Sequence, residues 1–117
     1  MELVAFLGRD KESWGQITGL INKGEWEKVV IVKTKESTDF PKPENAEEIL
    51  IDSSQLLLTL KDDLLKKLKP KLSGLEVSLS IASGNGKEHM ALISALLSLP
   101  VGIRLVVFTK SGVEFVN

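Results

Sequence analysis

The sequence predicts an α/β protein with a Rossmann-like three-layer sandwich, in which a mostly parallel sheet ends in a C-terminal antiparallel β-hairpin. Two observations lead to this fold class. Apolar runs of strand type alternate along the chain with segments of helical periodicity, and strands joined by helices form parallel sheets with right-handed crossovers. Only the last connection, Lys110-Ser111-Gly112, is too short to hold a helix, so the final two strands should form a hairpin.

The first strand and helix are marked by a change of periodicity. Residues 3–7 are apolar without alternation, which is typical of a strand covered on both faces. Apolar residues then recur at helical spacing; Ser13 and Gln16 are the expected capping box, and Gly24 should end the helix. These apolar residues are Trp14, Ile17, Leu20 and Ile21. The β-branched run 29–32 predicts the second strand.

The middle of the chain contains two more strands and a helix. After a polar loop with two prolines, residues 48–51 predict a short third strand. Asp52 and Gln55 are the expected cap of the next helix, which should end at Pro70. Its apolar stripe is Leu57, Leu60, Leu64 and Leu68. Alternating apolar and polar side chains over residues 75–82 predict the fourth strand.

The last third of the chain begins with a glycine-rich turn. This turn, Ser83 to Lys87, leads into a third helix that should end near Pro100. Residues 103–109 and 113–116 then predict the two strands of the hairpin.

Composition excludes several classes of function. The 117 residues are enough for one core, so we expect a single domain over residues 1–117. A net charge of -1 lacks the basic excess that sequence-independent binding of duplex nucleic acid requires. With no cysteine and one histidine, we expect no disulfide framework, no metal centre and no cofactor.

Targeting signals are not evident in the sequence. No apolar run is long enough for a membrane helix, and the N-terminus becomes charged too soon for a signal peptide. We therefore expect a cytoplasmic protein that does not bind membranes. Lysine predominates over arginine and glutamate over aspartate, a pattern that is typical of thermophiles.

The expected topology indicates where a ligand would bind. In the common doubly wound strand order, the first and fourth strands are neighbours where the winding reverses, and the loops that follow them bound the ligand crevice. These loops are Gly8 to Asp10 and Ser83 to Lys87. The candidate ligand-binding residues are therefore Gly8, Arg9, Asp10, Ser83, Gly84, Asn85, Gly86 and Lys87.

The second of these loops has the chemistry of an anion site. Gly84 and Gly86 permit positive φ, and Asn85 tolerates the left-handed region best after glycine. The first N–H groups of the following helix lack intrahelical partners, and Lys87 adds a positive charge. In the competing interpretation, the turn only redirects the chain and Lys87 is solvated, while Arg9 and its neighbouring aspartate form a local ion pair.

Known phosphate-loop motifs do not match this turn. A Walker A loop requires glycine where the chain has Ile81, and Gly8 alone is not a dinucleotide fingerprint. Two residues remain as candidate catalytic groups. Histidine as a residue type has an unperturbed pKa near neutrality, so His89 is a candidate general acid or base, and Lys87 would stabilise charge developing on a phosphate. A structural or surface role is the alternative for both.

The third helix, residues 85–99, is apolar on almost all sides. Such a helix is usually buried on more than one side, and in a small domain a second copy of the chain would supply the additional cover. We therefore expect a two-fold homodimer through this helix, with two Ser83–Lys87 loops forming one composite pocket.

The stretch SIASGNGKEHMALISALL and the order of the elements resemble the CRISPR-associated Rossmann fold (CARF) domains. In that family the fourth strand runs into a Thr/Ser-Gly-Gly-Thr-Lys-like turn and an Ala/Leu-rich helix. Ser83, Gly84 and Lys87 match this pattern, whereas Asn85 replaces the second glycine and Gly86 the threonine.

The resemblance implies a homodimer that senses cyclic oligoadenylate, a signal that family members usually pass to an attached effector domain. We expect no attached effector domain, so the resemblance implies a stand-alone sensor, a metal-independent ring nuclease that cleaves the messenger, or a sensor subunit with a separate partner. A further hypothesis comes from the residues themselves: the apolar third helix would dock another protein in a structural or regulatory role.

Overall fold

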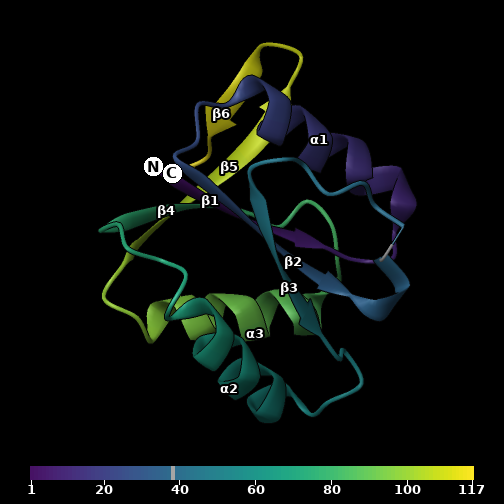
Figure 1. Ribbon diagram of the computed structural model, residues 1–117, viewed down its shortest axis with the longest axis vertical. Helices are drawn as coiled ribbons and strands as arrows, with labels where there is room; N and C mark the ends of the chain where they lie inside the picture. Colours follow the sequence, from purple (N-terminus) through teal and green to yellow (C-terminus); the bar gives the residue numbers. More distant parts are fainter. Residues whose placement is uncertain (38) are drawn as a thin grey trace.

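A six-stranded sheet runs through the middle of the molecule, with helices on both of its faces (Figure 1). The computed structural model describes residues 1–37 and 39–117. The strands are β1 (Glu2–Leu7), β2 (Lys28–Thr34), β3 (Ala46–Ile51), β4 (Glu76–Ser80), β5 (Gly102–Thr109) and β6 (Gly112–Phe115). The helices are α1 (Trp14–Lys23), α2 (Leu57–Leu68) and α3 (Gly86–Leu97), with 3-10 turns η1 (Lys11–Ser13) and η2 (Lys35–Ser37).

The strand order is β3-β2-β1-β4-β5-β6, and β1 to β5 are parallel. Strand β6 is antiparallel to β5, so the predicted fold class and the C-terminal hairpin are confirmed. The predicted contact between β1 and β4 is present too; Ala5 pairs with Ile31 of β2 on one side and Ser80 of β4 on the other. The winding direction therefore reverses at β1, where the crossovers pass from one face of the sheet to the other.

Strand β1 lies at the centre of the core, and every one of its side chains is buried. Val4 and Phe6 belong to the apolar cluster under α2 and α3, and the alternate residues belong to the cluster under α1. These alternate residues are Leu3, Ala5 and Leu7. The cover on both faces is the physical reason why the strand is apolar without alternation.

Helix α3 packs against the sheet and also against α2. Its buried apolar residues are Ala91, Leu92, Ala95 and Leu96, and the facing residues of α2 are Leu60, Leu64 and Leu68. Helix α2 thus supplies, within the same chain, a second cover for α3. Only part of the apolar surface of α3 stays exposed, chiefly Met90 (57%) and Leu97 (70%).

Both predicted helix caps are wrong, because the residues involved form other hydrogen bonds. Ser13 ends the 3-10 turn η1 without a capping hydrogen bond, and Gln16 accepts a hydrogen bond from the backbone of β5. The carboxylate of Asp52 accepts from the N–H and hydroxyl groups of Ser54 in a local turn, so α2 begins only at Leu57. Short polar side chains commonly prefer such local contacts to capping.

Strand boundaries differ from the prediction at several ends. Strand β3 begins at Ala46, two residues before the predicted start, and β4 is shorter than the predicted 75–82. Leu75 lies outside β4 and is 88% exposed. Ends of this kind depend on pairing with neighbouring strands, which apolar alternation alone does not reveal.

Candidate functional site

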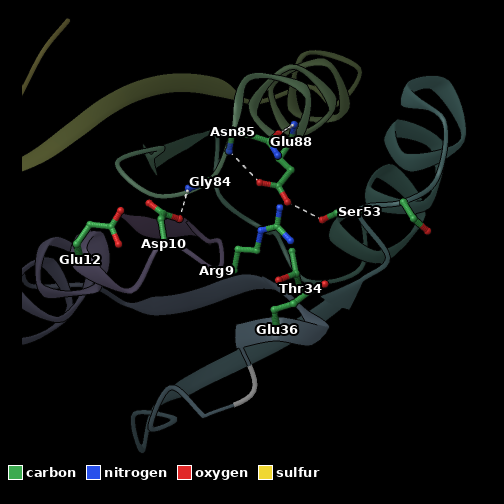
Figure 2. A pocket seen from close by; sticks show the side chains of 10 residues that line it. Arg9, Asp10, Glu12, Thr34, Glu36, Ser53, Gly84, Asn85 and Glu88 are labelled. Atoms are coloured by element: carbon green, nitrogen blue, oxygen red, sulfur yellow. Dashed lines mark hydrogen bonds between the residues drawn. The ribbon is translucent and has the colours of Figure 1, made fainter.

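A polar pocket of about 770 Å³ lies beyond the C-terminal ends of β1 to β4 (Figure 2). Its lining residues are Arg9, Asp10, Glu12, Thr34, Glu36, Ser53, Ser54, Gly84, Asn85 and Glu88. This is the edge at which ligands bind in open parallel sheets, next to the point where the strand order reverses. The loops after β1 and β4 both contribute to it, as do the ends of β2 and β3.

The loops after β1 and β4 approach so closely that side chains do not fit between them. A Cβ atom on Gly8 would lie 2.7 Å from the Cα of Gly84. Gly84 itself has φ +104°, and a Cβ there would lie 2.7 Å from the ring of Phe6. The N–H of Gly8 donates to the hydroxyl of Ser83 (2.9 Å), which joins the two loops directly. Glycine is therefore required at both positions.

Asp10 adds hydrogen bonds to the contact between the loops after β1 and β4, which we call the junction. Its carboxylate accepts hydrogen bonds from the Ser83 hydroxyl (2.8 Å) and from the Gly84 N–H (2.9 Å). Partial burial opposes ionisation, but bonds from the Ser83 hydroxyl, the Ser13 hydroxyl and the Gly84 N–H outweigh it. The pKa of Asp10 therefore lies below its ordinary value of 3.8. The aspartate is ionised at neutral pH and holds the β4–α3 loop against the β1 loop.

A capping box begins α3. The Asn85 side chain accepts from the N–H of Glu88, and the Glu88 carboxylate accepts from the N–H of Asn85, both at 2.9 Å. Ser53 donates to the other carboxylate oxygen of Glu88 at 2.5 Å, which ties the β3–α2 loop to α3. Sequence reasoning missed this role of Glu88, although the Asn-x-x-Glu pattern indicates it.

The backbone of the turn differs from the prediction. Asn85 is extended (φ −117°) because its side chain caps the helix, and Gly86 does not have positive φ. The N–H groups of Gly84 and Asn85, expected to be available to an anion, are taken by carboxylates. No hydrogen bond joins the N–H groups of Gly86 and Lys87 to another described residue. The exposed amide positions at the start of α3 are therefore these two.

The two candidate catalytic residues are engaged in structural hydrogen bonds and do not line the pocket. The ammonium group of Lys87 donates to the carbonyl of Ser53 (2.8 Å). Nε2 of His89 donates to the carbonyl of Ser83 (2.7 Å), and the ring packs edge-on against Phe6 with centroids 6.0 Å apart. Because a carbonyl only accepts, Nε2 carries the proton.

Of the predicted ligand-binding residues, four line the pocket: Arg9, Asp10, Gly84 and Asn85. Gly8 and Ser83 are buried beneath the two loops, where they form the junction. Gly86 and Lys87 are exposed at the start of α3, outside the lining. Sequence reasoning did not single out the remaining lining residues, namely Glu12, Thr34, Glu36, Ser53, Ser54 and Glu88.

Charge in the pocket is unevenly distributed. Arg9 is its one cationic lining residue, and it forms no ion pair with another described residue. The alternative of an Arg9–Asp10 ion pair is thus not realised. Four carboxylates also line the pocket, from Asp10, Glu12, Glu36 and Glu88. Figure 2 shows the Arg9 side chain between Thr34 and Glu36 on one side and Glu88 and Ser53 on the other.

Within residues 1–37 and 39–117, no group of three or more acidic or histidine side chains is arranged to hold a metal ion. In the same residues, no helix has the length and apolarity needed to cross a membrane. No protein-family model matches the chain, and no curated protein is significantly similar to it.

The close approach of the two loops predicts a contrast between glycines. Gly8→Ala should lower the free energy of unfolding by about 1–3 kcal/mol, because the new methyl group overlaps Gly84. Gly86→Ala is the matched control: a Cβ there meets nothing within 4 Å, so its effect should be neutral or stabilising by up to about 1 kcal/mol. Urea denaturation measures both, and equal effects would contradict the close approach.

The low pKa of Asp10 predicts a pH-dependent contribution to stability. The ionised carboxylate is hydrogen-bonded only in the folded state, so its stabilisation is present above the unfolded pKa and lost as pH falls through the lower folded pKa. Asp10→Asn should cost about 1–2 kcal/mol near neutral pH, and the cost should shrink below about pH 4.

Urea denaturation at several pH values tests this expectation. Asp62→Asn is the control, because that side chain is 74% exposed and holds no loop together. A cost of Asp10→Asn that stays constant down to about pH 2.5 would show that the charge is not involved.

Proposed function

We propose that this protein is a binding module for an anionic, nucleotide-type ligand, with cyclic oligoadenylate as the first candidate. The observation that carries the proposal is the guanidinium group of Arg9, which enters a polar pocket without an ion-pair partner among the described residues. An arginine that forms no salt bridge keeps its donors available for a phosphate, and its planar fork matches two phosphate oxygens.

The surroundings of Arg9 support the same ligand class. The pocket lies at the switch point of the sheet, where ligands bind in folds of this class. The exposed N–H groups of Gly86 and Lys87 begin α3 beside it, where the helix dipole favours negative charge. The resemblance to CARF domains points to cyclic oligoadenylate in particular, and a ligand of this kind implies a cytoplasmic protein.

Binding without cleavage is the better-supported form of this proposal. A ring nuclease would need Lys87 or His89 at the phosphate, but each donates a hydrogen bond to a backbone carbonyl outside the pocket lining. Of the four pocket carboxylates, those of Asp10 and Glu88 accept structural hydrogen bonds, and those of Glu12 and Glu36 belong to exposed residues that no described contact positions as a base. These contacts favour a sensor over an enzyme.

A two-fold dimer through α3 belongs to the proposal. From Met90 to Val101 the chain has no charged residue, and Met90 and Leu97 are exposed on this segment. In a two-fold interface the same patch of both copies meets, and residues close to the axis lie near their own copies, so charged residues there would face like charges. An uncharged, partly exposed helix face is therefore suited to self-association.

Calorimetry with cyclic tri-, tetra- and hexa-adenylate at low salt tests the ligand. We expect one of these rings to bind, and Arg9→Ala to weaken its binding by about tenfold or more, because a charged hydrogen bond to phosphate is lost. Arg104→Ala is the matched control, since Arg104 lies on β5 against Phe115 and the C-terminal residue. Absence of heat with every ring would count against the proposal.

Sedimentation velocity tests the dimer. We expect wild type to be dimeric at micromolar concentration and Leu97→Lys to be monomeric, because the substitution brings two like charges together at the interface. Leu75→Lys, which changes a still more exposed leucine outside α3 (88% against 70%), should remain dimeric. A monomeric wild-type protein would remove the dimer from the proposal.

A further inference from the structure

The pocket contains several hydrogen-bond acceptors, whereas a site for an anion needs hydrogen-bond donors. A site for a polyphosphate would combine several cations, whereas here one guanidinium faces four carboxylates. An ionised carboxylate repels phosphate and accepts hydrogen bonds from hydroxyl groups. The part of the ligand near these carboxylates must therefore present donors, and its phosphate must be confined to the neighbourhood of Arg9.

Two of the four carboxylates are occupied by the protein itself. That of Asp10 accepts from Ser83 and Gly84, and that of Glu88 accepts from Asn85 and Ser53. Glu12 and Glu36 are exposed lining residues. Neither carboxylate has a hydrogen bond to another described loop of the pocket, and the local bonds of Glu36, from its own N–H and the Thr34 hydroxyl, leave acceptor sites for a ligand.

Glu36 is the better placed of the two. It lies in η2 directly after β2, the strand next to β1, and Figure 2 shows it beside Arg9 and Thr34. In dinucleotide-binding Rossmann sheets, an acidic residue at the corresponding place accepts from a ribose hydroxyl; this chain lacks their glycine fingerprint, so the comparison concerns the position of the carboxylate alone. The backbone N–H of Glu36 and the Thr34 hydroxyl hold the pKa of Glu36 below its usual range, so the carboxylate stays ionised at neutral pH.

The segment that carries Glu36 is anchored to the pocket floor. The buried hydroxyl of Ser37 donates to the carbonyls of Leu7 and Gly8 and lies 3.1 Å from the Thr34 hydroxyl oxygen. This fixes the backbone that carries Glu36 relative to the loop that carries Arg9. The positive charge of Arg9 also acts on the Glu36 carboxylate, so the two groups share one region of the pocket.

We propose that Glu36 is a specificity residue that accepts a hydrogen bond from a ribose 2′-hydroxyl, while Arg9 binds the phosphate of the same nucleotide unit. The pocket would then select ribonucleotides with a single phosphate near Arg9 over deoxyribonucleotides and over polyphosphates. This inference rests on the proposed function, because it concerns the ligand of the same site. It names the chemical unit that is recognised, whether free or part of a ring.

Calorimetry with two matched pairs of probes tests the inference: cyclic tetra-adenylate with its all-2′-deoxy analogue, and adenosine 5′-monophosphate with its 2′-deoxy form. Wild type should bind the ribose member of at least one pair about tenfold more tightly, the value of one hydrogen bond to a charged group. Adenosine 5′-triphosphate should bind more weakly than the monophosphate.

Two variants separate the hydrogen bond from the general effect of charge. Glu36→Ala should bring the ratio of ribose to deoxyribose affinity close to one. Glu25→Ala removes the same charge from an exposed residue outside the pocket lining and should leave the ratio unchanged. Both side chains are exposed, so neither variant should alter folding.

The outcomes distinguish this inference from the proposed function. Equal affinity for the ribose and deoxyribose members in wild type would overturn the inference and leave the binding function standing. A ratio that survives in Glu36→Ala, or one that is lost equally in Glu25→Ala, would also overturn it. Absence of binding by all five probes, together with absence of heat with cyclic tri- and hexa-adenylate, would overturn both.

Discussion

The contact between the loops after β1 and β4 is the constraint on which the rest of the site depends. Gly8 and Gly84 lie against each other without room for a side chain, and the hydroxyl of Ser83 bonds across the gap. Asp10 then closes the junction from the pocket side. This contact sets where α3 begins and places Arg9 at the edge of the pocket. A bound ligand would contact a rigid pocket floor, because the loops after β1 and β4 and the segment after β2 are joined by hydrogen bonds.

The same contact changes the electrostatics of the helix start. An isolated α3 would offer a row of unpaired N–H groups to an anion. In the folded protein, the carboxylates of Asp10 and Glu88 accept hydrogen bonds from two N–H groups of the turn before α3. The side chain of Asn85 accepts a third hydrogen bond, from the N–H of Glu88. The positive charge available to a ligand therefore comes mainly from Arg9 and from the exposed amides of Gly86 and Lys87. This balance suits a nucleotide unit that places one phosphate near Arg9 and hydroxyl groups near the carboxylates better than it suits a contiguous polyphosphate.

Sequence reasoning was reliable for features that are set by residues close together in the chain. Strand and helix types follow from periods of two and 3.6 residues, and they were correct for every major element. It failed at the caps, because Asp52 and Gln16 each had another available partner. The predicted left-handed backbone conformation of Asn85 failed for the same reason. Its side chain can support a tight turn or accept a capping hydrogen bond from the N–H of Glu88, and only the folded geometry selects the cap.

The sequence by itself determined the order of strands and helices and therefore the edge of the sheet at which a ligand would bind, because parallel crossovers of one hand allow few arrangements. It also identified Arg9 and Asp10 as residues of that edge. Only the tertiary structure decided that Glu36 and Ser53 join them and that Lys87 and His89 turn to backbone carbonyls. The physical reason is distance along the chain: these contacts join segments brought together by packing, and local residue patterns carry no information about such partners.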